Sequence, residues 1–313
     1  MYLCENMSNK FMADKLSIIW WNTSLSPSKK RDRADIEQHE AALIILAALV
    51  KKYSLDIISL GEVSPNDIVA LKKIFNDGKY GFYDGSFTNS DCRINHDLCV
   101  IYNKEKLVCL NSKDITKQSY MGAIRAGHEL HFQHLESLHD FFIYILHWPS
   151  RNHIFNEDSV SRFELGRTVR DAIEKCISKN NAEYFIITGD FNDEPFNDSI
   201  VKGLGATRDR SIVLDKEQLL YNPFWRHIGH KESLDEYSEK TSWGTCYYKG
   251  DKFSKWKTFD QIIFSSAFIK KSHWFLKEDS VKILRDFNLE DLIYNSKYNF
   301  DHLPVMASLE RVN

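Results

Sequence analysis

The sequence predicts a layered α/β or α+β fold, and three observations support this prediction. The chain begins with a strand, a helix, a second strand and a second helix, which favours helices packed on a sheet. Its middle contains strands with hardly any helix between them, which favours an antiparallel meander. A further helix then leads into one strongly apolar strand. Because residues 16–313 contain no repeat, linker or low-complexity tract, we expect a single domain.

The N-terminal elements follow from the spacing of apolar residues. Residues 1–15 are polar and are expected to form a flexible N-terminus, and residues 16–21 are predicted to be a strand ending at Asn22. Residues 35–53 repeat apolar side chains every three to four positions, which is typical of a helix with one buried face. The basic residues of 29–33 fit either a solvated loop or a loop that steers a polyanion to a phosphate site.

The second strand is predicted over residues 55–60 and ends at Gly61 and Glu62. A helix should begin at Ser64, because serine caps helix N-termini and the following Pro65 fits the first helical turn. The strands of the middle part are predicted at 80–83, 97–102, 107–110, 123–134 and 140–147.

The second half of the chain contains one long helix, an irregular segment and three strands. Residues 161–178 have helical periodicity and lead into the apolar strand 184–187. The side of this helix that we expect to be buried consists of Phe163, Leu165, Val169, Ile173 and Ile177. Residues 208–257 are irregular and rich in aromatic and charged residues, and such long segments are usually functional or poorly ordered. The last two strands are predicted at 258–264 and 301–309.

Composition narrows the possible functions. A net charge of −3 argues against a protein that coats nucleic acid by charge alone, although local basic patches remain compatible with it. Six scattered cysteines favour reduced thiols in the cytoplasm over disulfides or a zinc site. There is no secretion signal, and the longest apolar run, 41–50, is too short to span a bilayer. We therefore expect a cytoplasmic protein without a membrane span, and no protein partner can be inferred.

A candidate site follows the apolar strand 184–187. Gly189 lets the backbone turn there, and alternate residues of an extended segment point the same way. Asp190 and Asn192 should therefore emerge side by side at the carboxyl end of the strand. A carboxylate next to a carboxamide suits a hard cation and a phosphate. The alternative is that both residues cap the next turn, as Asx residues commonly do.

Polar residues also follow several of the other predicted strands or begin the last one. Those residues are Asn22, Glu62, His147 and the pair Asp301 and His302. Asp260 lies within a predicted strand, where an unpaired carboxylate would be costly. Each residue alone fits a cap or a surface position, but together they indicate a site for metal and phosphate.

Six motifs resemble, in the family order, those of the endonuclease/exonuclease/phosphatase superfamily, which includes deoxyribonucleases, abasic-site endonucleases, inositol polyphosphate 5-phosphatases and neutral sphingomyelinases. They are WWN at 20–22, GE at 61–62, HWPSR at 147–151, GDFNDEPF at 189–196, FDQIIFS at 259–265 and DHLPV at 301–305. The chain looks most like a bacterial subgroup of intracellular members. The resemblance implies a four-layered α/β sandwich, with two mixed sheets packed face to face and helices outside.

The resemblance also implies a metal site. Glu62 would be the principal Mg²⁺ ligand, with Asn22 beside it and Asp301 completing the site directly or through water. Magnesium keeps several waters and takes few protein carboxylates, which suits this set. Mn²⁺ is a possible substitute.

The catalytic roles that the resemblance implies fall on five residues. Asp190 would position or deprotonate the attacking water, and Asn192 would hold that water or a phosphate oxygen. His302, oriented by Asp260, would donate to the scissile phosphate. His147 would be a second donor to the phosphoryl oxygens.

Three arginines are candidates for binding substrate phosphate: Arg125, Arg151 and Arg162. A planar guanidinium grips phosphate with two hydrogen bonds, so such residues are expected at a phosphoester site. The alternative for each of them is an ordinary surface arginine.

The chain departs from the family pattern at a few positions. Gly61 stands where relatives usually carry Gln, and Phe300 stands where many carry Ser, but neither change removes a ligand. The partner of His147 is left open, with Asn95 and Asp97 as candidates.

The leading hypothesis is a Mg²⁺-dependent phosphodiesterase, an endonuclease or exonuclease, that hydrolyses DNA or RNA by in-line attack of an activated water. The alternative is a phosphatase or phosphodiesterase for a small-molecule or lipid phosphoester. Its substrate would be enclosed by the aromatic residues Phe224, Trp225, Trp243, Tyr247 and Tyr248. A scaffold that lost the chemistry is disfavoured, because every motif residue with a catalytic role is present.

Overall fold

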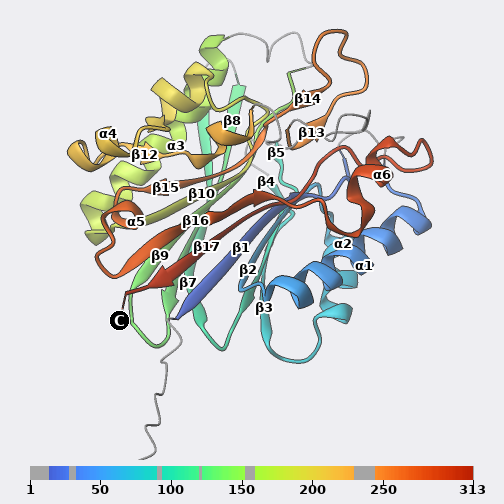
Figure 1. Ribbon diagram of the computed structural model, residues 1–313, viewed down its shortest axis with the longest axis horizontal. Helices are drawn as coiled ribbons and strands as arrows, with labels where there is room; N and C mark the ends of the chain where they lie inside the picture. Colours follow the sequence, from blue (N-terminus) through green and yellow to red (C-terminus); the bar gives the residue numbers. More distant parts are fainter. Residues whose placement is uncertain are drawn as a thin grey trace, which may run out of the picture.

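Two mixed β-sheets lie face to face, with helices on their outer faces, in the computed structural model of the protein (Figure 1). The structure describes residues 14–27, 33–89, 94–119, 122–151, 159–228 and 244–312. This arrangement confirms the predicted four-layered α/β sandwich. Most of the predicted flexible N-terminus, 1–13, and most of the predicted basic loop, 29–32, lie outside the described residues.

The first sheet has the strand order β16 (Trp274–Ile283), β17 (Val305–Arg311), β1 (Lys15–Asn22), β2 (Ile57–Gly61), β6 (Leu98–Asn103) and β3 (Tyr80–Gly85). Strand β1 runs parallel to β2 and antiparallel to β17. Helices α1 (Ile36–Tyr53) and α2 (Pro65–Ile74) lie on the outer side of this sheet (Figure 1). Helix α2 begins as predicted, because Ser64 and Asp67 form a capping box.

The second sheet has the order β11 (Ala206–Thr207), β12 (Leu220–Tyr221), β15 (Asp260–Ser265), β10 (Tyr184–Asp190), β9 (Asp140–His147), β8 (Gly122–His134) and β7 (Leu107–Ser119). Strand β10 is parallel to β9 and antiparallel to β15. This register places Asp190 opposite both His147 and Asp260. Helix α3 (Ser159–Asn180) packs on the outer face of the sheet, over a separate apolar core.

Shorter elements connect these layers. They are β4 (Thr88–Asn89), β5 (Ile94–Asn95), a π-helix (Ser199–Leu204), α4 (Arg210–Asp215), a 3₁₀-helix (Pro223–His227), β13 (Cys246–Tyr247), β14 (Trp256–Lys257), α5 (Ala267–Lys270), a 3₁₀-helix (Asp286–Asn288) and α6 (Leu289–Tyr294). Among the residues that the structure describes, no helix combines the length and the apolar character needed to cross a membrane.

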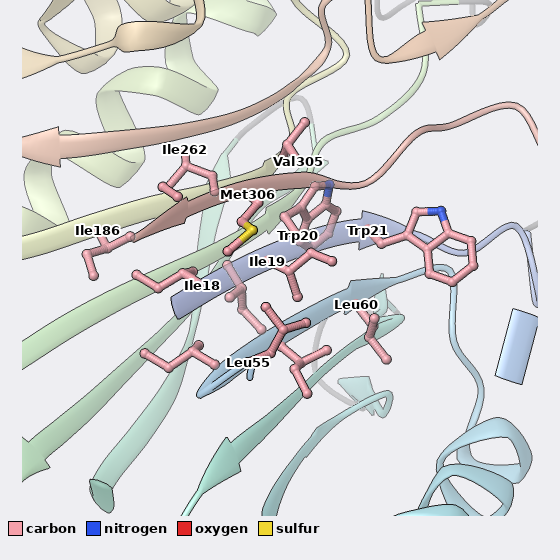
Figure 2. Close-up of a cluster of buried hydrophobic side chains, with 14 of the residues drawn as sticks. Ile18, Ile19, Trp20, Trp21, Leu55, Leu60, Ile186, Ile262, Val305 and Met306 are labelled. Carbon is pink, nitrogen blue, oxygen red and sulfur yellow. The ribbon is translucent and has the colours of Figure 1, made fainter. Parts of the chain in front are cut away.

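The main core lies between the two sheets. Ile18 and Trp20 of β1 lie in the same cluster of buried side chains as Ile186 of β10 and Ile262 of β15 (Figure 2). Burial of large apolar side chains from both sheets holds the sheets together and fixes how their strand ends meet.

Two expectations are wrong. The strands predicted at 97–102 and 107–110 do not belong to one meander, because β6 joins the first sheet and β7 joins the second. The apolar pattern of a strand indicates which face is buried but not which sheet the strand joins. Ile177 of α3 is 40% exposed, whereas Cys176 is buried. One position along a helix is a rotation of about 100°, which turns Ile177 away from the sheet.

Candidate active site

Strand ends from both sheets meet in one cleft. Strand β1 ends at Asn22, β9 at His147 and β10 at Asp190, while Glu62 follows β2 directly. Side chains alternate along a strand, so Asp190 lies on the same face as Ile186, which belongs to the core between the sheets. The predicted site residues of the two sheets therefore face one another.

Asp190 is buried, and amide groups hold its carboxylate. One oxygen accepts from Nδ2 of Asn22 at 3.4 Å and from Nδ2 of Asn192 at 3.2 Å. The other oxygen accepts from the Asn192 backbone amide at 2.8 Å. Nδ2 of Asn192 also donates to the carbonyl of Trp148 at 2.9 Å, so this side chain orients Asp190. Burial raises the pKa of Asp190, and the positive charge of His302 opposes this effect.

His302 contacts Asp260, as the resemblance implied. Nδ1 of His302 lies 2.7 Å from Oδ2 of Asp260, and Nε2 lies 3.7 Å from Asp190. Burial lowers the pKa of His302, but the Asp260 carboxylate outweighs burial and holds the pKa well above its usual range. His302 is therefore protonated at neutral pH.

Trp20 supports this pair and explains the departure at Gly61. The Trp20 indole donates to the second oxygen of Asp260 at 2.7 Å. A β-carbon at position 61 would lie 2.8 Å from the Trp20 ring, which is closer than side chains pack. The space that a larger residue at 61 would need is thus occupied by the ring that holds Asp260. The sequence analysis placed Trp20 in a strand and gave its indole no partner, so this hydrogen bond was missed.

His147 is paired with Asp97, not with Asn95. Nδ1 of His147 lies 2.8 Å from Oδ2 of Asp97, and Nε2 lies 3.9 Å from both Glu62 and Asp190. Burial lowers the pKa of His147, but Asp97 outweighs burial and raises the pKa to about 9. His147 is therefore a second cation facing the same carboxylates.

The acidic residues Glu62 and Asp301 fit the predicted metal site. Among the described residues, no group donates a hydrogen bond to the Glu62 carboxylate, and its nearest cation is His147 at 3.9 Å. Burial raises the pKa of Glu62 to about 7, and Asp301 adds to this effect although His147 opposes it. Asp301 accepts from the Ser24 hydroxyl at 2.8 Å, and Oδ1 of Asn22 accepts from the Ser24 amide at 3.2 Å. Two carboxylates and an amide oxygen are a donor set that suits Mg²⁺.

A second set of ligand atoms lies close together but is already hydrogen-bonded. Atoms of Asp190, Asp260 and His302 lie within 4.8 Å of one another, a spacing that could hold a metal ion. Both oxygens of Asp260 accept hydrogen bonds, one from Trp20 and one from His302. We therefore assign this set to the orientation of His302 and not to metal binding.

The three predicted arginines all donate to protein groups. Arg162 is 5% exposed, and its three guanidinium nitrogens donate to Asp193 and to two backbone carbonyls. Arg162 borders neither part of the cleft, so the predicted phosphate contact is dropped for this residue. Arg151 also donates to Asp193, at 3.0 Å, but borders the cleft. Arg125 borders the cleft and lies 3.4 Å from Asp97.

Asp193 was missed by the sequence analysis, although it lies in the same GDFNDEPF motif as Asp190. It is buried and holds Arg151, Arg162 and the hydroxyl of Ser199. A carboxylate that pairs two arginines stabilises the loop after β10, which carries the amides that donate to Asp190.

The cleft has two lobes. The larger lobe has a volume of about 870 Å³ and is bordered by aromatic residues that include Tyr248 and Trp256. The smaller lobe has a volume of about 540 Å³, and its border includes Phe87 and Arg125. The residues that border both lobes are Glu62, His147 and Ser150. The lobes therefore meet at Glu62 and His147, whereas Asp190 and His302 border the larger lobe only.

The aromatic residues predicted to enclose a substrate only partly do so. Tyr248 borders the larger lobe, but Trp225 and Tyr247 border neither lobe. Phe224 is fully buried in the core. Trp243 lies outside the described residues.

The fold is similar to that of several solved structures. The human Nocturnin catalytic domain with bound sulfate has 15% sequence identity and a TM-score of 0.60, with 96% of each chain covered. The Bacteroides thetaiotaomicron mannosyl-6-phosphatase has 16% identity and a TM-score of 0.60, with 95% of this chain and 100% of that chain covered. D. rerio TDP2 complexed with single strand DNA product has 20% identity and a TM-score of 0.57, with 95% and 99% covered.

At these identities the structural similarity shows the fold alone. A search of curated protein sequences finds no match. A sequence model described as the Endonuclease/Exonuclease/phosphatase family matches residues 26–304, which is most of the chain. The chain therefore belongs to the endonuclease/exonuclease/phosphatase family.

Proposed function

We propose that the protein is a divalent-metal-dependent phosphodiesterase that hydrolyses DNA or RNA in the cytoplasm. Members of its family are phosphoester hydrolases. One observation favours a diester: the two lobes of the cleft meet at Glu62 and His147, beside Asp190 and His302 of the larger lobe. A phosphodiester has a substituent on each side of the phosphorus, so each lobe would take one. A phosphomonoester would need only one lobe.

Asp190 is the general base in this proposal. Its raised pKa makes the carboxylate a better proton acceptor for the attacking water. Asn22 and Asn192 hold the carboxylate in one orientation, which aligns that water with the leaving oxygen. A positioned general base contributes about 10²–10⁴-fold to the rate.

His302 and His147 are the cationic donors. Their Nε2 atoms lie 3.7 Å and 3.9 Å from the same atom, Oδ2 of Asp190. Both imidazoles therefore face the position where the water and the scissile phosphate would meet. His302 donates to the scissile phosphate, and His147 donates to a phosphoryl oxygen. Fixed positive charge in a buried site stabilises the charge that develops in the transition state.

Glu62, Asp301 and Asn22 would hold the divalent metal, Mg²⁺ or its substitute Mn²⁺. When bound, the ion supplies positive charge that offsets the negative charge of the phosphate. The arginines are of secondary importance here: Arg125 and Arg151 border the cleft and add positive charge to it.

A second candidate function is a phosphatase or phosphodiesterase acting on a small-molecule or lipid phosphoester. The larger lobe favours it, because a volume of about 870 Å³ lies within the range of small-ligand pockets. Tyr248 and Trp256 would cover an apolar part of such a substrate. The similar structures include both a mannosyl-6-phosphatase and a TDP2 complexed with single strand DNA product.

The test is hydrolysis of plasmid DNA, single-stranded DNA, RNA and a panel of phosphomonoesters by the purified protein, with Mg²⁺, Mn²⁺ or EDTA. We expect nucleic-acid cleavage that EDTA and the variant Asp190→Ala both abolish. Asp198→Ala is the matched control, because it removes an exposed carboxylate outside the cleft and should cleave normally. Phosphate release from monoesters with nucleic acid left intact would replace this proposal with the second candidate. No hydrolysis of any ester would contradict both.

A further inference from the structure

We propose that the smaller lobe of the cleft binds an unpaired nucleobase next to the scissile phosphate, so that the substrate is single-stranded nucleic acid. The proposal rests on the phosphodiesterase function proposed above and names its substrate class. Phe87 and His96 provide the evidence. Phe87 and His96 border this lobe together with Glu62 and His147, and the hydrolysis proposed above gives no role to Phe87 or His96.

Phe87 provides a face for stacking. Its side chain is 40% exposed, although it is apolar and lies in a cleft bordered mostly by polar and charged residues. The inner part of the ring packs on His96, with the ring centroids 5.0 Å apart. Stacking of a base on an aromatic ring is a recurrent means of binding single strands, and it tolerates any base sequence.

His96 provides a polar nitrogen that the protein does not use. The residue is 4% exposed, and its Nε2 has no hydrogen-bond partner among the described residues. Buried polar atoms are nearly always paired, so an unpaired one at the border of a cleft indicates a ligand that completes it.

A chain of hydrogen bonds determines how this nitrogen acts. Nδ1 of His96 lies 2.7 Å from Nε2 of His128, and Nδ1 of His128 lies 2.6 Å from the Tyr83 hydroxyl. Ser112 also hydrogen-bonds to Tyr83, and with the serine hydroxyl as donor the Tyr83 proton goes to His128. His128 then donates to Nδ1 of His96. Nε2 of His96 therefore carries a hydrogen and is a donor.

An unpaired nucleobase matches this combination of groups. Every base has an apolar face for Phe87, and its edge carries oxygen or nitrogen acceptors for a donor such as Nε2 of His96. In a duplex both faces of a base are stacked and its pairing edge is occupied, so a paired base would not fit. The lobe thus selects a single strand without selecting its sequence.

The test uses a short single-stranded oligonucleotide of the kind that the wild-type protein cleaves, in which each position in turn carries a tetrahydrofuran abasic residue. For the wild-type protein, kcat/KM should fall about tenfold at one position beside the cleavage site. Phe87→Ala should lower kcat/KM about tenfold on the intact strand, with no further loss when that position is abasic. Phe87→Tyr keeps an aromatic face and should retain the wild-type kcat/KM on the intact strand. Phe253→Ala removes a fully exposed phenylalanine that borders neither lobe and is the matched control.

Two further substrates test the other parts of the proposal. A difluorotoluene base at the sensitive position keeps the apolar face but lacks strong acceptors. It should lower kcat/KM of the wild-type protein about threefold. A complementary strand should slow cleavage about tenfold. The proposal is overturned if Phe87→Ala loses as much on the abasic strand as on the intact one, or if no abasic position matters. Wild-type protein that cleaves no nucleic acid would instead overturn the phosphodiesterase function, and this proposal with it.

Discussion

Two pairs of histidines near the cleft differ in charge state. His302 and His147 each lie within 2.8 Å of a carboxylate, which holds the pKa of both above the usual range. His96 and His128 instead hydrogen-bond to each other, and burial lowers the pKa of both, that of His128 to about 3. Burial alone makes a histidine neutral, and a carboxylate in contact reverses this effect. The chain thus places positive charge where a phosphate would bind and a neutral donor where a base would bind.

The largest effect is expected from Asp260→Asn, which removes the anion that keeps His302 protonated. We expect kcat to fall about 10²–10⁴-fold at neutral pH, because His302 would no longer be a cationic donor. Because its pKa is lower in the variant, His302 loses its proton at a lower pH than in the wild-type protein. The pH profile of kcat measures this shift of the alkaline limb. An alkaline limb at the wild-type position would contradict the role of Asp260.

Asp97→Asn should make His147 resemble the neutral pair, with a smaller effect on activity. The pKa of His147 should fall from about 9 toward or below 6.5. The kcat at neutral pH should therefore drop about 10–100-fold and recover partly in acid. Asp77→Asn changes an exposed aspartate outside the cleft and is the control. Equal losses for Asp97→Asn at all pH values would show that Asp97 does not act through the charge of His147.

The neutral pair should make the fold sensitive to acid. Histidine in the unfolded chain has a pKa of about 6.5, whereas that of His128 in the fold is about 3. Between these values the unfolded chain binds more protons, so the free energy of unfolding should fall as the pH drops from about 6.5. The expected slope from this residue is about 1.4 kcal/mol per pH unit. Urea denaturation across this range should give a shallower dependence of unfolding free energy on pH for His128→Asn than for the wild-type protein. Equal slopes for the two proteins would be evidence against a neutral His128.

The smallest effect is expected from Tyr83→Phe, which removes the hydroxyl that begins the chain of hydrogen bonds from Tyr83 through His128 to His96. Nδ1 of His128 would then be buried without a partner, which should cost about 1–2 kcal/mol of unfolding free energy. Tyr102→Phe is the control, because Tyr102 lies on the neighbouring strand β6 and no hydrogen bond of its hydroxyl is found among the described residues. Similar losses for both variants in urea denaturation would remove the Tyr83 hydroxyl from the chain of hydrogen bonds.

Much of the candidate site could be predicted from the sequence. Asn22, Glu62, His147 and Asp190 lie at the ends of apolar strands, and strand ends that meet at one edge of a sandwich bring such residues together. The resemblance to the family added the pairing of His302 with Asp260, which the structure shows, and the residue roles, which stay predictions. These features are local, because each depends on the residue type and its place on one strand.

Other parts of the site depend on pairings that no local pattern encodes. The choice of Asp97 over Asn95 for His147, and the bond from Trp20 to Asp260, depend on which residues meet across the two sheets. Arg162 follows the HWPSR motif and was expected to bind phosphate, yet its guanidinium donates to Asp193 and to the carbonyl of Phe191 in the loop after β10.

The sequence by itself determined most of the longer strands but not β16, the main helices, the family motifs and the order of the polar strand ends. Only the tertiary structure decided that β6 and β7 join different sheets, that the cleft has two lobes, and that Asp97 is the carboxylate partner of His147. The physical reason is that periodicity reports the environment of one segment, whereas the charge of a buried group is set by the neighbours that long-range packing brings to it.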